Sequence, residues 1–264
     1  MEEPAFLSVD LGDADIEQNR EVIEGFGLIL RQSVDTLRAP GTVPLLAGSL
    51  FGNHYYGEAR TRELLGGLAA RERCHPDAVT ERWFSGYVEQ LVHPVLHLFF
   101  AHGVVFEPHL QNVVLGLRHG WPAQLFLRDF EGVKLTPARY PAAAMPDISE
   151  RARASLWYDE EQGWNRIAYC LFVNNLCEVV AQLGAGRPAL AARLWSIVSH
   201  HLHVYQHRYG NAVSGRRVNA LLAGSPFPAK TNLSNRFFKR ADRASTYVPV
   251  TNPLPFAGTG AAWQ

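Results

Sequence analysis

Apolar residues recur every three or four positions along several stretches of the chain, which is the spacing that places them on one face of a helix. The clearest stretch covers residues 77–102, where Trp83, Tyr87 and Leu91 keep this spacing. Pro94 is expected to kink or interrupt that helix. Further helices are predicted over residues 17–33, 58–73, 164–183 and 188–209, followed by a short one that ends near residue 222.

Two stretches in the middle of the chain follow a β pattern instead. They are GVVFEPHLQNVVLGLR and PAQLFLRDFEGVKL, separated by the short turn His119-Gly120-Trp121. Runs of β-branched and aromatic residues on either side of a turn predict a hairpin. Residues 136–148 contain three prolines and are expected to form a loop. We therefore predict an α+β fold, in which a small antiparallel sheet built around a central hairpin packs among several long helices.

Polar side chains interrupt both runs of this hairpin. Glu107, His109 and Gln111 alternate, so an extended strand would point them to one face, whereas Asn112 would point to the other. Asp129 follows on the second strand. An amide and a carboxylate from adjacent strands suit Mg²⁺ bound to phosphate oxygens. The alternative is a buried hairpin whose polar residues pair with one another. The cost of burying polar groups without partners favours a functional site.

Composition narrows the function classes. The chain has 25 basic and 25 acidic residues, which argues against attraction to nucleic acid or to an anionic membrane. We find no signal peptide and no apolar run of transmembrane length, so a cytoplasmic protein is expected. The three cysteines, Cys74, Cys170 and Cys177, form no C-x-x-C motif. They are expected to be reduced thiols in the core.

The pattern E-x-H-x-Q-N followed by R-D-F-x-G resembles a known family. It is similar to the C-terminal palm, or FhuF-like, region of siderophore synthetases of the aerobactin-synthetase (IucA/IucC) type, which act independently of nonribosomal peptide synthetases. Weaker matches, such as GFGLILR at 25–31 and NPL at 252–254, extend the resemblance over most of residues 20–255. It implies one palm-like domain over residues 25–264, preceded by an N-terminal extension over residues 1–24.

The resemblance also implies a reaction. The family uses ATP and Mg²⁺ to adenylate a carboxylate of citrate or a related acid, and an amine or hydroxyl then displaces AMP. A polycarboxylate and an amine are thus the expected small-molecule partners. The resemblance implies catalytic roles for His109 and Gln111. It implies nucleotide or metal binding for Asn112, Asp129 and Glu131, with Asn112 and Asp129 as metal ligands. The implied substrate-binding residues are Glu107, Arg128, Asn175, Lys230 and Arg236.

Asn175 has a second interpretation. It lies in the middle of an apolar helical pattern, where asparagine is a poor residue. Its side chain is expected either to reach the substrate or to make a hydrogen bond between helices.

Family members also carry an N-terminal half with a nucleotide loop rich in Ser, Arg and Thr, and residues 1–24 show no such motif. We therefore expect activity to need a partner chain with that half, or a homo-oligomer, and whether the chain alone is an enzyme stays open. The alternatives are a kinase-like phosphotransferase with the same metal ligands, and a non-catalytic palm that binds a carboxylate or siderophore or acts as a scaffold.

Two further functions are not expected. Reductases related to this region hold an iron–sulfur cluster with C-terminal cysteines, and the terminus TNPLPFAGTGAAWQ has none. His203 and His207 are four positions apart on a predicted helix, but the sequence offers no H-E-x-x-H motif and no third zinc ligand.

Overall fold

The computed structural model describes residues 5–7, 27–52, 60–141, 143, 145, 148, 150–231, 237–238 and 246–256. The helices within these ranges are, in chain order, α3 (Ala47–Phe51), α4 (Arg60–Glu72), α5 (Pro76–His102), α6 (Glu150–Leu156), α7 (Glu160–Ala168), a π-helical segment (Tyr169–Cys177), α8 (Glu178–Leu183), α9 (Pro188–Tyr209) and α10 (Ala212–Leu222). The strands are β1 (Ala5–Leu7), β2 (Leu28–Leu30), β3 (Thr42–Leu46), β4 (Val104–Val105), β5 (Val113–Arg118), β6 (Trp121–Leu127), β7 (Lys134–Leu135), β8 (Phe227–Lys230) and β9 (Tyr247–Val250).

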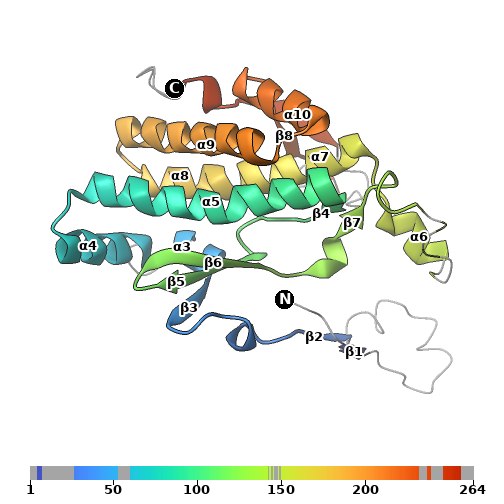
Figure 1. The fold of residues 1–264 in the computed structure, drawn as a ribbon, viewed down its shortest axis with the longest axis horizontal. Coiled ribbons are helices and arrows are strands. Elements are labelled where there is room, and N and C mark those ends of the chain that lie inside the picture. Colours follow the sequence, from blue (N-terminus) through green and yellow to red (C-terminus); the bar gives the residue numbers. More distant parts are fainter. Residues whose placement is uncertain are drawn as a thin grey trace.

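Helix α5 occupies the middle of the molecule, between α9 on one side and strand β6 on the other (Figure 1). Its first turn contains Pro76, a residue that suits the start of a helix. The His75 Nδ1 caps this end by accepting a hydrogen bond from the Asp77 N–H. It ends at Gly103, whose φ of 68° is the left-handed conformation typical of a helix end. The predicted helix is confirmed, but Pro94 does not interrupt it, because packing on both sides outweighs one lost backbone hydrogen bond.

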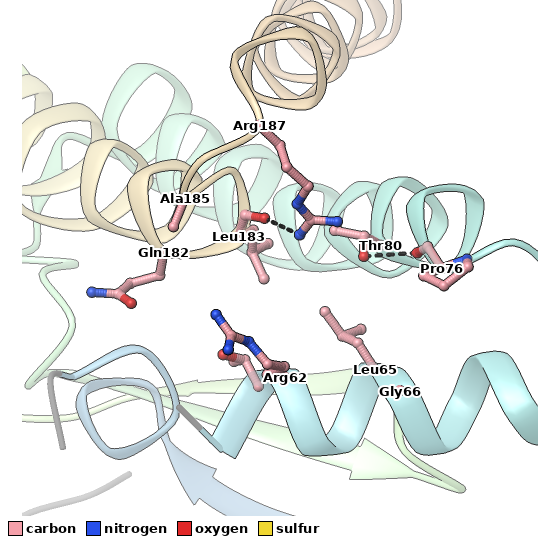
Figure 2. Close-up of a pocket in the computed structure, with 10 residues that line it drawn as sticks. Arg62, Leu65, Gly66, Pro76, Thr80, Gln182, Leu183, Ala185 and Arg187 are labelled. Atoms are coloured by element: carbon pink, nitrogen blue, oxygen red, sulfur yellow. Dashed lines mark hydrogen bonds between the residues drawn. The ribbon is translucent and has the colours of Figure 1, made fainter. Parts of the chain in front are cut away.

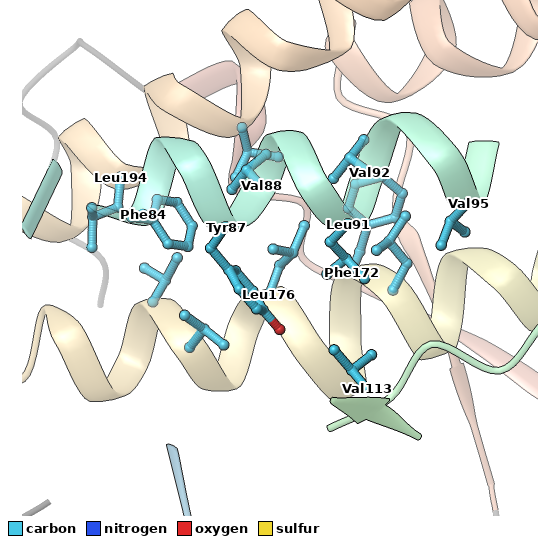
Figure 3. Packing of buried hydrophobic residues seen from close by; sticks show 14 of the residues in the cluster. Phe84, Tyr87, Val88, Leu91, Val92, Val95, Val113, Phe172, Leu176 and Leu194 are labelled. Carbon is cyan, nitrogen blue, oxygen red and sulfur yellow. The ribbon is translucent and has the colours of Figure 1, made fainter. Parts of the chain in front are cut away.

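The core forms where α5 meets the π-helical segment. Figure 3 shows Tyr87 and Leu91 of α5 facing Phe172 and Leu176 of that segment. All four side chains are fully buried. Each large apolar side chain removed from water contributes about 1.5–3 kcal/mol, so this contact fixes the two helices against each other.

The predicted hairpin is present as β5 and β6, and β5 is the middle strand of the sheet β3-β5-β6. His119 and Gly120 form its two-residue turn with φ values of 54° and 87°, the combination that matches the twist of paired strands. The third strand, β3, pairs antiparallel with β5. Helices around this small antiparallel sheet confirm the α+β fold class.

Two segments differ from the prediction. Residues 28–30, placed in a predicted helix over 17–33, form β2, which pairs with β1. A short apolar run does not distinguish a helix from a strand, and here all three side chains are exposed. Residues 17–26 lie outside the described residues. The second segment lies after the last predicted helix, where no strand was predicted, and it contributes strands β8 and β9, which pair antiparallel. No helix in the described part of the chain is long and apolar enough to span a membrane.

The cysteines are free thiols but not all belong to the core. Cys74 is exposed, which contradicts its predicted burial. Its position just after α4 ends, where the chain turns toward α5, leaves it on the surface. Burial raises the pKa of both Cys170 and Cys177 to about 12. Those two thiols therefore stay protonated and unreactive near neutral pH.

Histidines form a buried seam between α5 and α9. His93 donates through Nε2 to the backbone carbonyl of His201 at 3.1 Å, and the His201 Nε2 lies 2.9 Å from the Ser85 Oγ. Burial lowers the pKa of His201 to about 4, with further lowering by the charges of His93, His200 and Arg208. The seam is therefore neutral at pH 7 and resists protonation.

This seam predicts a pH-dependent stability. An unfolded histidine titrates near 6.5, so the unfolded state takes up a proton before the folded state does, and folding stability falls as the pH drops from 6.5 toward 4. His201→Gln removes this titration. We expect the melting temperature of the variant to depend less on pH than that of the wild type between pH 7.5 and 4.5, measured by circular dichroism. His203→Gln, an exposed position on the same helix, serves as the control. Equal pH slopes for wild type and His201→Gln would contradict the prediction.

Candidate functional site

The polar segment between β4 and β5 is a tight turn and not a strand. The His109 N–H donates to the Glu107 carbonyl and the Asn112 N–H to the His109 carbonyl, both at 2.9 Å. Pro108, which lies between Glu107 and His109, has no N–H to donate to a strand partner. The expectation that Glu107, His109 and Gln111 line one face of a strand is therefore wrong. Glu107 and His109 are half-buried, whereas Gln111 is exposed.

The end of β6 is tied to this turn. The Arg128 N–H donates to the Asn112 carbonyl at 3.1 Å, and the Arg128 Nε donates to the Gln111 carbonyl at 2.9 Å. Asp129 follows with a φ of 69°, a left-handed conformation that is uncommon for residues other than glycine, although Asp and Asn adopt it more readily than most. The hairpin thus brings together the segments that carry Asn112 and Asp129, and it holds Asp129 in an uncommon backbone conformation.

A charged cluster lies beside the turn. The Arg166 Nη2, at the end of α7, is 2.9 Å from the Glu107 Oε1, and the Glu107 Oε2 is 3.8 Å from the His109 Nε2. These side chains keep only 15% (Arg166), 19% (Glu107) and 22% (His109) of their surface exposed. Burial lowers the pKa of His109, although the charges of Glu107 and Asp129 oppose that shift. His109 is therefore neutral at pH 7, next to a carboxylate whose charge Arg166 offsets.

Aromatic residues complete the cluster, and sequence analysis missed them. The Arg166 Nη2 lies 3.4 Å from the Tyr158 hydroxyl. The Tyr247 ring, on β9, has a pKa raised to about 12 by burial, and Arg166 is among the charges that act on it. Strand β9 pairs with β8 so that Tyr247 is opposite Lys230. The charge of Lys230 affects the pKa of the Cys170 thiol, as do the charges of Glu107 and Arg166. The predicted Lys230 therefore lies near the same cluster.

Arg166, Tyr158 and Tyr247 come from segments remote from the hairpin in sequence. The local signal for Arg166 is a charged residue next to the apolar positions of WNRIAY. That signal does not identify Glu107 as its partner, because only the fold brings the two together.

Asn175 lies inside the protein. It is fully buried; its Oδ1 accepts from the Tyr87 hydroxyl at 2.6 Å and its Nδ2 donates to the Pro108 carbonyl at 2.8 Å. Of the two interpretations of this residue, the structure shows the hydrogen bond between helices. Its second bond reaches the turn that carries Glu107 and His109.

Two side chains at the turn lack hydrogen-bond partners among the described residues. They belong to Asn112, which is 5% exposed, and to Asp129. Within the same residues, no group of three or more His, Cys, Asp or Glu side chains is placed to hold a metal ion by itself. Mg²⁺ needs no such group, because it is bound through one or two protein oxygens together with phosphates and waters. Asn112 and Asp129 fit that role.

The remaining predicted residues are only partly placed. Glu131 belongs to a short 3₁₀ turn over Phe130–Gly132, but its side chain is outside the described part of the structure, as is Arg236. Exposed His203 and His207 belong to none of the contacts described above.

A separate cavity of about 430 Å³ lies elsewhere, between α4, the start of α5 and the end of α8 (Figure 2). Its lining includes Arg62, Thr80, Gln182 and Arg187. Arg187 also forms an ion pair with Asp77 at 2.8 Å. None of the residues predicted from the sequence lines this cavity, so the candidate site is the turn and its charged cluster.

Comparisons with known proteins show which family the chain belongs to. Residues 81–245 match the family model described as ferric iron reductase FhuF-like transporter. The chain is 26% identical to L-2,3-diaminopropanoate–citrate ligase from Staphylococcus aureus over 252 residues, which are 95% of this chain and 42% of that protein. It is 28% identical to the rhizobactin siderophore biosynthesis protein RhbC from Rhizobium meliloti over 261 residues, with 96% and 42% covered.

The fold agrees as well. The structure of ATP-bound aerobactin synthetase IucA from a hypervirulent pathotype of Klebsiella pneumoniae superposes with a TM-score of 0.70 at 23% identity, covering 86% of this chain and 39% of that one. The chain thus spans about 42% of the length of the two curated relatives. It belongs to the FhuF-like family, and its homologues are the siderophore synthetases of the aerobactin-synthetase (IucA/IucC) type, whose C-terminal region it matches.

Proposed function

We propose that this domain is the palm part of a cytoplasmic, ATP-dependent ligase that joins citrate or a related polycarboxylate to an amine or hydroxyl through an acyl adenylate, in siderophore biosynthesis for iron acquisition. The observation that carries the proposal is the placement of neutral His109 beside the Glu107–Arg166 pair and next to Asn112 and Asp129. The citrate ligase among its relatives and the ATP-bound structural neighbour support it.

Asn112 and Asp129 are the residues that would hold Mg²⁺ with the phosphates of ATP, together with Glu131. Their oxygens are the hard ligands that Mg²⁺ prefers. When bound, the metal supplies charge neutralisation for the phosphates and for the departing pyrophosphate. The left-handed backbone at Asp129 supports this assignment, because uncommon conformations of this kind gather at functional sites.

His109 and Gln111 would act on the acid. A neutral imidazole both donates and accepts hydrogen bonds, so His109 can orient the carboxylate that attacks ATP and later accept the proton released by the attacking amine. The cations Arg128, Lys230 and Arg236 would attract a polycarboxylate. Arg166 offsets the charge of Glu107, which removes a source of repulsion toward an anionic substrate. We propose that further phosphate contacts come from a partner chain or a second copy.

Pyrophosphate release tests this function. The domain is combined with the part of RhbC that it does not match, and ATP, Mg²⁺, citrate and hydroxylamine are supplied. We expect citrate-dependent pyrophosphate release and hydroxamate formation with both parts, and weak or no release from this chain alone. Release of ADP and phosphate instead would favour the kinase-like alternative. Citrate binding without turnover would favour a non-catalytic palm, and robust release by this chain alone would contradict the need for a partner.

Asp129→Asn should weaken binding of Mg²⁺·ATP by about tenfold or more, equivalent to about 1.4 kcal/mol, because an amide offers a neutral ligand in place of a charged one. Asparagine tolerates a positive φ, so the fold should be unchanged. Calorimetry on the combined assembly measures the affinity, and circular dichroism checks the fold. Asp35→Asn, an exposed position near β3, is the matched control. Unchanged affinity in Asp129→Asn would remove Asp129 from the site.

The pKa of His109 should respond in opposite directions to its two neighbours. Glu107 raises the pKa of His109 and Arg166 lowers it. Glu107→Gln should therefore lower that pKa, and Arg166→Gln should raise it, as measured by NMR titration of the histidine ring. Arg193→Gln, at an exposed ion pair on α9, is the control and should leave His109 unchanged. If both site variants move the pKa in the same direction, the cluster does not act on His109 as described.

A further inference from the structure

A chain of two hydrogen bonds connects the centre of α5 to the functional turn. The Tyr87 hydroxyl donates to the Asn175 Oδ1 at 2.6 Å, and the Asn175 Nδ2 donates to the Pro108 carbonyl at 2.8 Å. Tyr87 and Asn175 are both fully buried. Figure 3 shows the Tyr87 hydroxyl directed away from α5, beside Leu176 and among apolar side chains. Three segments that are far apart in sequence therefore meet through one side-chain amide.

The orientation of that amide follows from its partners. Burial raises the pKa of Tyr87 above its ordinary value, so its hydroxyl stays protonated and acts as the donor. The Pro108 carbonyl can only accept, so the Asn175 NH₂ group must face it, and the Asn175 oxygen then faces the Tyr87 hydroxyl. A reversed amide would oppose two acceptors at Pro108 and would offer the Tyr87 hydroxyl no acceptor for its proton. A buried group left unpaired costs about 1–3 kcal/mol, so the pair of bonds locks the arrangement.

The π-helical segment makes this contact possible. Arg166 bonds to Glu107, and Asn175, nine positions later on the same continuous helix, bonds to the adjacent residue Pro108. At 3.6 residues per turn, positions nine apart lie about 180° apart on an α-helix and face opposite ways. The π-helical turns over Tyr169–Cys177 contain one more residue in each hydrogen-bonded ring, which rotates the later positions back. One helix can therefore hold the turn at two adjacent residues.

From this geometry we propose that Asn175 is a positioning residue for the ligase site, and that Tyr87 orients it. The inference rests on the proposed function, in which His109 faces the acid. Asn175 is fully buried and would act through the turn: it fixes the Pro108 carbonyl, and with it the places of Glu107 and His109 on either side. The π-helical segment is the device that brings Arg166 and Asn175 to the same turn, and such segments occur frequently at functional sites.

Two variants test the inference. Asn175→Asp keeps the shape and the acceptor for Tyr87 but sets an oxygen against the Pro108 carbonyl. Tyr87→Phe keeps the ring and removes only the hydroxyl that orients the amide. Asn174→Ala, the neighbouring half-buried amide, is the matched control. The first readout is the NMR titration of His109 in this domain, which needs no activity. The second is steady-state kinetics of the combined assembly with citrate and ATP.

We expect both variants to stay folded, to shift the His109 titration, and to lower kcat/KM for the acid by about tenfold or more, because misplacing a reacting group by an ångström costs that much. KM for ATP should stay within about twofold of the wild-type value, since the variants change no residue assigned to nucleotide binding. Asn174→Ala should match the wild type. An unchanged pKa of His109 in folded Tyr87→Phe would overturn the proposal. Equal losses of kcat/KM for ATP and for the acid would overturn it as well. If Asn175→Asp fails to fold, Tyr87→Phe decides alone. If the wild-type assembly shows no citrate-dependent turnover, the proposed function fails, and the His109 titration still decides whether Asn175 positions the turn.

Discussion

A buried polar group needs a partner, and in this protein that requirement links the core to the site. The Tyr87 hydroxyl lies in an otherwise apolar interior, where an unpaired hydroxyl would be costly. Asn175 satisfies it and uses its remaining donor on Pro108, the residue between Glu107 and His109. The contact between α5 and the π-helical segment therefore sets the position of the functional turn as well as the stability of the core.

Opposing electrostatic effects act on the protonation of His109 in the same turn. Burial favours a neutral His109, whereas Glu107 and Asp129 favour a charged one. Arg166 offsets Glu107 at 2.9 Å, so the imidazole stays neutral next to carboxylates. A neutral imidazole beside a compensated carboxylate is suited to binding and orienting an acid. Asn112 and Asp129, whose side chains make no hydrogen bonds among the described residues, remain available for a metal and its phosphates.

Sequence patterns predicted the parts of the fold whose signals are local. The spacing of Trp83, Tyr87 and Leu91 predicted α5 because a helix repeats its buried face every three or four residues. The hairpin was predicted because β-rich runs flank a turn. The strand face assigned to Glu107, His109 and Gln111 was wrong, since alternation over five residues does not reveal the turn that forms around Pro108.

Other features depend on contacts that no local pattern records. Arg166, Tyr158 and Tyr247 join the site only because α7, the segment before it and β9 meet beside the hairpin. The π-helical segment carries the same apolar spacing as its neighbours, so the sequence predicted one continuous α-helix there. The motif did identify the segments around Asn112 and Asp129, and the hairpin brings these together as expected.

The central claim is that Asn112 and Asp129 frame the metal of a nucleotide site at this turn. Mn²⁺ replaces Mg²⁺ at oxygen-rich sites and can be located by its anomalous X-ray scattering. A crystal structure of the combined assembly with ATP and Mn²⁺ is therefore the most direct measurement. We predict an anomalous peak in contact with the side-chain oxygens of Asn112 and Asp129. A peak at the cavity lined by Arg62 and Arg187, or ATP bound with no metal at the turn, would contradict the account.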